Sequence, residues 1–192
     1  MCIRDRSKIG MKVLAWIISR IRGEQNIRKL IKKGLKIGRD CNIQGGVIID
    51  DSHCFHIEIG NNVTLAPRVH ILAHDASTKI FLDYTKISNV KIGNNVFIGA
   101  GAIILPGSII EDNVIIGAGS IVSKRIPANS VAVGSPAKVV STLHDYLEKE
   151  KEQMCVENCF GASYSIGDRM FSERKRQQLL DAVKKHMKIY LK

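Results

Sequence analysis

The sequence predicts an all-β solenoid, because apolar residues recur every six positions through the middle of the chain. The longest unbroken series is Ile92, Ile98, Ile104, Ile110, Ile116 and Val122. The same interval separates the members of two earlier series, Ile37, Ile43 and Ile49, and Ile59, Leu65 and Ile71. A period of six fits neither a strand nor a helix, whose side chains repeat every 2 and 3.6 residues. It suits a chain of flat faces joined at corners, with three short strands in each triangular coil.

Glycine and asparagine mark the corners of these coils. They recur at matching points as Gly60-Asn61-Asn62, Gly93-Asn94-Asn95 and Asp112-Asn113. Glycine adopts positive φ without steric cost and asparagine tolerates the left-handed region, so both suit a tight corner. The apolar residue of each repeat then points inward and stacks on its equivalent in the next coil. Strands of adjacent coils pair in parallel about 4.8 Å apart and enclose a core of isoleucine and valine.

Composition and charge limit the classes of protein that fit this chain. It has 192 residues, of which 45% are hydrophobic and 5% aromatic, and a formal net charge of +11. This length suits one domain with appendages. The basic residues are dispersed toward both ends and aromatic side chains are scarce, so we expect no nucleic-acid partner. The number of cysteines, five, is odd, so a full set of disulfides is not expected and a reducing cytoplasm is favoured. No apolar run reaches the ~20 residues that a membrane span needs.

Helical segments are expected on both sides of the solenoid. We expect a leader (residues 1–7) and helices over residues 1–34, the solenoid over 35–140, and a helical extension over 141–192. The first helix carries Trp16 among basic residues. It either packs on the open first coil or a neighbouring subunit, or gives the protein a peripheral attachment to the inner face of the membrane. The other helices that we expect span Glu24–Lys33, Leu143–Cys155 and Glu173–Lys192.

The last repeats resemble a known enzyme family. Residues Lys91–Val140 read KIGNNVFIGAGAIILPGSIIEDNVIIGAGSIVSKRIPANSVAVGSPAKVV. They are similar to the hexapeptide-repeat acyltransferases, whose coil is a left-handed parallel β-helix, and within them to the sugar O-acetyltransferases that act on galactosides, maltose and surface polysaccharides. The resemblance covers about residues 35–140. It implies transfer of an acetyl group from acetyl-CoA to a hydroxyl of a sugar or surface-polysaccharide precursor, in a homotrimer whose sites lie between subunits.

Catalysis is expected where the repeat is interrupted, since a regular coil offers no projecting loop to enclose a substrate. The six-residue frame breaks after Ile71, and residues 74–89 form an inserted loop. In the resembled enzymes an essential histidine opens such a loop, which implies His74 as the general base. An imidazole can take the proton of a sugar hydroxyl as its oxygen attacks a thioester. The resemblance also implies that the backbone N–H of Ala100 stabilises the oxyanion, and Tyr84 in the loop is a candidate acceptor contact.

A second irregularity supplies further candidates for acceptor binding. Residues 50–58 contain four more residues than the frame allows. Within them Asp50 and Asp51 could orient the base or bind acceptor hydroxyls, as an acidic residue does in the resembled enzymes, and His53 could line the same site. Phe97 occupies a place where some of the resembled enzymes carry tryptophan beside the acceptor, and core packing is its equally plausible alternative.

The coenzyme is expected to lie along the later repeats, where tiny residues at matching points of successive coils leave a groove for the pantetheine arm. Other positions match those that meet the nucleotide and its phosphates in the resembled enzymes. The last of these is often arginine there, and a lysine in its place keeps the charge without the two-pronged geometry. The candidate coenzyme contacts are Gly99, Ala100, Ala118, Ser123, Lys124 and Lys138.

Other activities known on this kind of coil stay open. An N-acetyltransferase of a nucleotide sugar would differ mainly in its acceptor. A zinc enzyme of the γ-carbonic anhydrase type needs three histidines, and His70 and His74 are one residue short of the required H-x4-H spacing, so we expect no metal. A non-catalytic structural β-helix would make His74 incidental, and the signature at Lys124 and Lys138 speaks against it.

Overall fold

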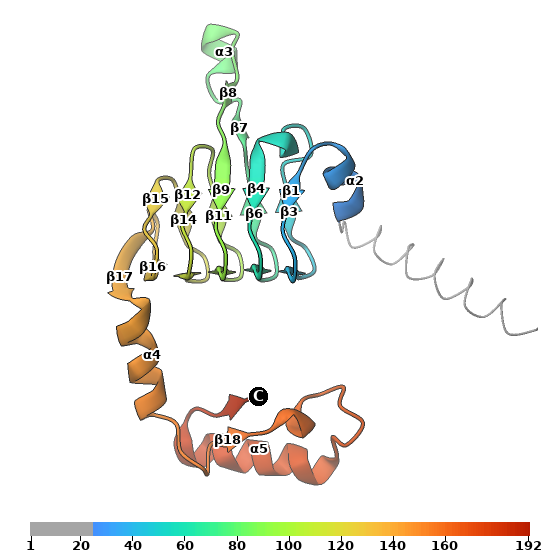
Figure 1. The fold of residues 1–192 in the computed structure, drawn as a ribbon, viewed down its shortest axis with the longest axis vertical. Helices are drawn as coiled ribbons and strands as arrows, with labels where there is room; N and C mark the ends of the chain where they lie inside the picture. Colours follow the sequence, from blue (N-terminus) through green and yellow to red (C-terminus); the bar gives the residue numbers. More distant parts are fainter. Residues whose placement is uncertain (1–24) are drawn as a thin grey trace, which may run out of the picture. The chain divides into compact units, whose positions relative to one another are not determined.

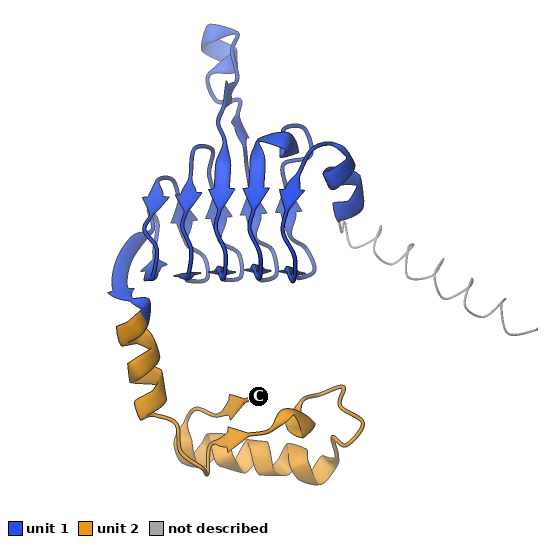
Figure 2. Ribbon diagram, viewed as in Figure 1, with its two compact units in different colours: residues 1–143 blue, residues 144–192 orange. Residues whose placement is uncertain are grey.

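The computed structural model describes residues 25–192, which fall into two compact units (Figure 2). The first unit extends to residue 143 and contains all the six-residue repeats. The second comprises residues 144–192. The leader and the expected first helix with Trp16 lie outside the described residues. Among the described helices none is long and apolar enough to cross a membrane.

Short strands of the first unit pass through three sheets in turn (Figure 1). The first sheet consists of β1 (Lys36–Ile37), β4 (Ile57–Ile59), β9 (Val90–Ile92), β12 (Ile109–Ile110) and β15 (Arg125–Ile126). The second consists of β2 (Asn42–Ile43), β5 (Thr64–Leu65), β10 (Phe97–Ile98), β13 (Val114–Ile116), β16 (Ser130–Val133) and β17 (Lys138–Thr142). The third consists of β3 (Ile48–Ile49), β6 (His70–Ile71), β11 (Ile103–Ile104) and β14 (Ile121–Val122). Three successive strands therefore complete one coil.

The apolar ladder of the sequence forms the interior of these coils. In the third sheet Ile49 aligns with Ile71, Ile71 with Ile104, and Ile104 with Val122, all in parallel register. These four side chains are 0% exposed. The predicted stacking of one inward residue per strand is therefore confirmed, and it gives neighbouring coils a shared core.

Two neighbouring isoleucines of β12 allow a test of how much the inward ladder contributes to the free energy of unfolding. Ile110 is 1% exposed and Ile109, the preceding residue, is 42% exposed. Replacing Ile110 by alanine is expected to lower the free energy of unfolding by about 2–5 kcal/mol, because it removes buried methyl groups and leaves a cavity. Ile109→Ala is the matched control and should cost much less. Urea denaturation of both variants measures the difference, and equal losses would contradict the inward stacking.

Asparagine side chains bind coil to coil at one corner. Asn62, Asn95, Asn113 and Asn129 all have φ between 54° and 58°. Each side-chain amide nitrogen donates to the oxygen of the next asparagine, at 2.9, 2.9 and 3.0 Å. The expected left-handed corner residues are thus these asparagines. Gly60 has another role, since a Cβ there would lie 2.6 Å from the carbonyl oxygen of Gly93, and only glycine allows this approach.

Two excursions leave the regular coils of the first unit. The first follows β3 and contains a short 3-10 helix, η1 (Cys54–His56). The second is the inserted hairpin, residues 74–89, in which β7 (His74–Asp75) pairs antiparallel with β8 (Lys86–Ile87) and α3 (Lys79–Leu82) lies at the tip. The tip projects well beyond the strands (Figure 1). Both excursions begin at the ends of neighbouring strands of the third sheet, β3 and β6.

The ends of the solenoid differ in detail from the expectation. The helix expected over Glu24–Lys33 is α2 (Ile27–Lys32), because the Asn26 side chain caps it by accepting from Lys29 N at 3.2 Å. At the other end β17 pairs antiparallel with β16. The parallel coil therefore ends at β16, before the expected limit of residue 140.

The second unit contains strands that we did not expect. Its helices are α4 (Leu143–Glu152), which begins one residue before the unit, the 3-10 helix η2 (Ala162–Tyr164) and α5 (Glu173–His186). The last helix was expected to continue to Lys192, but Met187 has a φ of 59° and ends it. The chain then forms β19 (Tyr190–Leu191), which pairs in parallel with β18 (Cys159–Phe160).

Candidate active site

A buried carboxylate joins the two excursions. The Asp50 side chain directly follows β3 and is 1% exposed. One of its oxygens, Oδ1, accepts from the backbone N–H groups of Ser52 at 3.1 Å and His53 at 3.0 Å. The other, Oδ2, accepts from the backbone N–H groups of Ala73 and His74, both at 3.1 Å. Asp50 therefore fixes the start of the inserted hairpin against the segment that follows β3.

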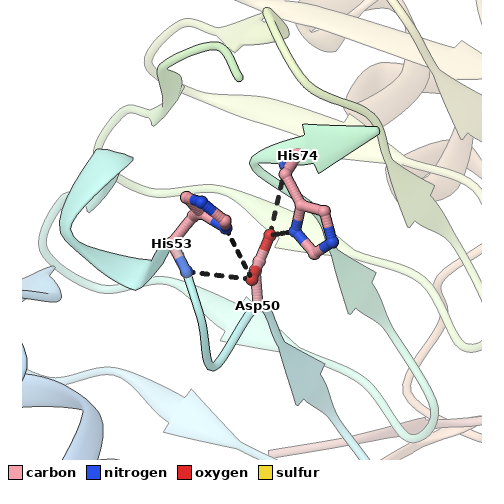
Figure 3. Close-up of side chains that lie close together, drawn as sticks. All are labelled: Asp50, His53 and His74. Carbon is pink, nitrogen blue, oxygen red and sulfur yellow. Dashed lines mark hydrogen bonds and ion pairs between the residues drawn. The ribbon is translucent and has the colours of Figure 1, made fainter. Parts of the chain in front are cut away.

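The same carboxylate orients the ring of His74. His74 Nδ1 forms a hydrogen bond with Asp50 Oδ2, which Figure 3 shows beside the backbone contact. Because an ionised carboxylate only accepts hydrogen bonds, Nδ1 carries the proton and Nε2 keeps a lone pair in the neutral ring. The ring can thus accept a proton at Nε2 while Nδ1 stays bound. This is the arrangement that a histidine general base requires.

Opposing effects set the charge of Asp50. Burial by itself would raise the pKa of its carboxyl group. The hydrogen bond from the His74 ring and those from the backbone of Ala73 and His53 outweigh burial and leave the pKa below its ordinary value. The carboxylate is therefore ionised at neutral pH and can stabilise the imidazolium that proton transfer creates.

His53 lies against the pair of Asp50 and His74. Its ring centroid is 4.8 Å from that of His74, and its Nδ1 is 3.9 Å from Asp50 Oδ1 (Figure 3). That nitrogen is buried and has no hydrogen-bond partner among the described residues. One ligand atom from each of Asp50, His53 and His74 lies within 4.8 Å of the others, so this set could also hold a divalent metal ion. The set differs from the His70 and His74 pair considered from the sequence.

A cavity of about 600 Å³ opens beside His74, and we call it the His74 cavity. Lys86 forms an ion pair with Asp75 at its edge, at 2.6 Å. The ammonium group of Lys86, with the N–H and hydroxyl of Ser77, holds the pKa of Asp75 well below its ordinary value. The cavity is lined by Leu72, His74, Asp75, Ala76, Lys86, Ser88, Leu105, Pro106 and Ser123.

The other acceptor candidates lie apart from the His74 cavity within one chain. Asp51 is exposed and forms an ion pair at 2.8 Å with Lys33, the residue directly after α2. Tyr84 is exposed in the inserted hairpin. Phe97 points outward from β10 in the second sheet, on a different face, so the core-packing alternative is wrong. Of the acceptor candidates, the structure thus brings only Asp50 and His53 to His74.

The coenzyme candidates are distributed over several corners. Ser123 lines the His74 cavity. Ala100 and Ala118 are exposed on successive coils, and Gly119 N donates to Ala100 O at 2.9 Å. Gly99 is buried, and a Cβ there would lie 2.5 Å from Ala118 N, so its small size allows the coils to stack. The two lysines among these candidates, Lys124 and Lys138, are exposed.

Sequence reasoning did not identify the apolar wall of the cavity. Leu105 and Pro106 line it together with Ser88, which lies near the end of the inserted hairpin. The register of the repeats could have indicated this wall. Ile104 aligns with Ile71, so Leu105 is expected beside Leu72, two residues before His74.

Comparison with known proteins relates these features to an enzyme family. A family model described as bacterial transferase hexapeptide (six repeats) matches residues 89–124. Protein CapG from Staphylococcus aureus is 39% identical in an alignment of 146 positions that covers 72% of this chain and 81% of CapG. The galactoside O-acetyltransferase of Lactococcus lactis is 36% identical in an alignment of 147 positions that covers 64% of this chain and 70% of that enzyme. The crystal structure of a maltose O-acetyltransferase from Clostridium difficile has a TM-score of 0.50 and 31% identity, and the match covers 72% of this chain and 89% of that one.

Proposed function

Since this chain belongs to the bacterial hexapeptide-repeat transferases, we propose that it transfers an acetyl group from acetyl-CoA to a hydroxyl of a sugar or surface-polysaccharide precursor. The chain is an acetyltransferase, as are its relatives of Lactococcus lactis and Clostridium difficile. One observation carries the proposal of mechanism. The ring of His74 is bound at Nδ1 by the buried carboxylate of Asp50 and adjoins a cavity of about 600 Å³.

The proposed reaction needs no acyl-enzyme. The acceptor hydroxyl donates its proton to Nε2 of His74 as its oxygen attacks the thioester carbonyl carbon. A tetrahedral intermediate forms, and its oxyanion is bound by the backbone N–H of Ala100. The carbon–sulfur bond then breaks, and the departing thiolate of coenzyme A takes the proton from the imidazolium. Asp50 stays ionised throughout and holds the ring.

Two corners of the coil support a site shared between subunits. His74 follows β6, at the corner between the third and first sheets, whereas Ala100 follows β10, at the corner between the second and third sheets. A site that uses both therefore takes them from two copies of the chain. We propose a homotrimer of left-handed coils in which His74 of one copy faces Ala100 of the next.

The outward residues of the third sheet suit such an interface. They are Ile48, His70, Ile103 and Ile121, which align across the four strands. The outward residues of the first sheet include Lys36, Glu58, Lys91 and Arg125. An apolar face is more readily buried against another subunit than a charged one. The third sheet is therefore our proposed subunit interface.

The coenzyme contacts, the domain organisation and the cellular location are also part of the proposal. Coenzyme A would lie along Gly99, Ala100, Ala118, Ser123, Lys124 and Lys138, with the two lysines on its phosphates. The domain organisation would be a leader and helices over residues 1–34, a repeat domain with its inserted hairpin over 35–140, in which the parallel coil ends at β16, and an extension over 141–192. We propose a cytoplasmic location for this chain.

Asp50→Asn tests both proposed roles of this carboxylate, which are to bind four backbone N–H groups and to orient the ring of His74. Each carboxylate oxygen faces two backbone N–H donors, so an amide NH₂ in either orientation opposes donors. We expect the free energy of unfolding to fall by about 1–3 kcal/mol and kcat to fall about 10²-fold, because the ring of His74 loses its orientation. Thermal unfolding and steady-state kinetics measure both. The control is Asp51→Asn, which removes the neighbouring surface charge.

The loss of stability in Asp50→Asn should depend on pH in one direction. The pKa of Asp50 is lowered in the folded chain, so its ionised form stabilises the fold above the unfolded pKa of about 3.9. That contribution disappears as the pH falls through the lower folded pKa. The difference in stability between wild type and Asp50→Asn should therefore narrow below about pH 4. A difference that grows on acidification would contradict an ionised Asp50.

Acetyl-CoA consumption against a panel of acceptors tests the function itself. The panel contains monosaccharides, oligosaccharides, nucleotide sugars and amino sugars, and thiol release reports turnover. O-acetylation of a saccharide is the expected result. Acetylation of an amine on a nucleotide sugar would favour the N-acetyltransferase instead. Turnover that depends on added Zn²⁺ would favour a metal at Asp50, His53 and His74.

A further inference from the structure

A second cavity lies on the outward face of the first sheet, and we call it the Phe55 cavity. Its volume is about 390 Å³, within the range of sites for small molecules. It shares no lining residue with the His74 cavity. Both excursions nevertheless contribute to it, since Phe55 and His56 belong to η1 and Asn89 ends the inserted hairpin. The segments that build the catalytic pair therefore also build this cavity.

Four side-chain rings connect the two cavities. The ring centroid of His74 is 4.8 Å from that of His53, His53 is 6.1 Å from Phe55, and Phe55 is 4.6 Å from His56. His74 lines one cavity, and Phe55 and His56 line the other. Because the two cavities share no lining residue, a ligand that occupied both would extend beyond the group held at His74. A second sugar of the acceptor would supply that extension.

Phe55 is exposed yet firmly held. Its side chain is 52% exposed, while the preceding residue, Cys54, is fully buried. A Cβ on Gly34 would lie 2.7 Å from the Cβ of Phe55, so the base of this side chain lies close against the chain after α2. The neighbouring ring is fixed by the contact of His56 Nδ1 with Asn89 Oδ1 at 2.7 Å. A rigid aromatic surface beside hydrogen-bonding groups suits a sugar, which has an apolar C–H face and polar edges.

The charges around the Phe55 cavity are unequal. Two lysines and one glutamate line it, Lys36, Lys91 and Glu58. Lys36 and Glu58 form an ion pair with each other. Lys91 lies next to Glu58 in the register of β4 and β9 and forms no ion pair with any other residue in the range 25–192. One cation therefore remains for a ligand.

We propose that the Phe55 cavity binds a second sugar of the acceptor, one that carries an anionic group, while the sugar to be acetylated lies at His74. The inference rests on the proposed acetyltransferase function and narrows its acceptor to an anionic oligosaccharide or a saccharide phosphate. Phe55 and His56 contact the sugar rings, and Lys91 binds the carboxylate or phosphate. Lys91 and Phe55 thus determine specificity and take no part in proton transfer.

Acceptor kinetics of two variants test the subsite. The acceptors are a uronic-acid disaccharide, its neutral counterpart, a nucleotide sugar and a neutral monosaccharide. Lys91→Met should raise the KM for anionic acceptors about tenfold, with kcat and the KM for acetyl-CoA unchanged. Phe55→Ala should raise the KM for both disaccharides and leave the monosaccharide unaffected. Lys32→Met, which removes an exposed cation from α2, is the matched control.

The outcomes separate this inference from the function. An effect of Lys91→Met on the disaccharide alone identifies a carboxylate, and an effect on the nucleotide sugar alone identifies a phosphate. If both variants match wild type with every acceptor while His74→Ala is inactive, the subsite is wrong and the function stands. If wild type acetylates no saccharide, the function is wrong. Calorimetry then still tests the subsite, which requires disaccharide binding that Lys91→Met weakens about tenfold.

Discussion

Replacement of His74 by alanine is expected to lower kcat for acetyl transfer by about 10²–10⁴-fold, the usual contribution of a positioned general base. The acceptor hydroxyl would then have to lose its proton to water. The loss should appear with every acceptor, because the base acts on the hydroxyl itself. Thiol release from acetyl-CoA under saturating substrates measures it.

The fold and coenzyme binding should survive this change. His74 is partly exposed, and its ring contacts Asp50 and His53 at the edge of the coil. Thermal unfolding and calorimetric binding of coenzyme A are therefore expected to stay close to wild type. His144→Ala, at an exposed histidine of the second unit, controls for loss of an imidazole. Near-normal turnover of His74→Ala would show that the base is a different residue.

Much of the fold could be predicted from the sequence because its interactions repeat. Ile92 and Ile110 each occupy the inward place of a short strand, and one register relates them to Ile59. A side chain that stacks on its own equivalent needs no information from elsewhere in the chain. The inward ladder and the asparagine corners were therefore predictable. The second unit has no repeat, and its strands β18 and β19 lie far apart in sequence, so its pairing could not be predicted.

Of the candidate site, only the residue that directly follows a regular repeat could be proposed from the sequence. His74 could be proposed as the base because the frame breaks directly before it and because the resembled enzymes carry a histidine at this place. The role of Asp50 was left open from the sequence because the extra residues that follow it blur the alignment. Its four backbone donors come from two excursions whose conformations depend on each other. The Phe55 cavity depends on the same mutual arrangement, so no local pattern indicates it.

The central claim is that each site takes His74 from one copy of the chain and Ala100 from the next. Mixing two inactive variants within one trimer tests it most directly. His74→Ala removes the base, and Ala100→Trp blocks the oxyanion donor and the adjacent groove with a large side chain. Each variant alone should be inactive. The two chains, carrying different tags, are produced together and the mixed oligomers are purified through both tags.

Random assembly of equal amounts gives each site a chance of one half for an intact His74 and one half for an intact Ala100. We therefore expect about a quarter of the wild-type activity per site before selection, and about a third in the mixed trimers purified through both tags, from two variants that are each inactive. Mixed trimers that are no more active than either parent would contradict a shared site, because intact His74 and Ala100 would then never meet.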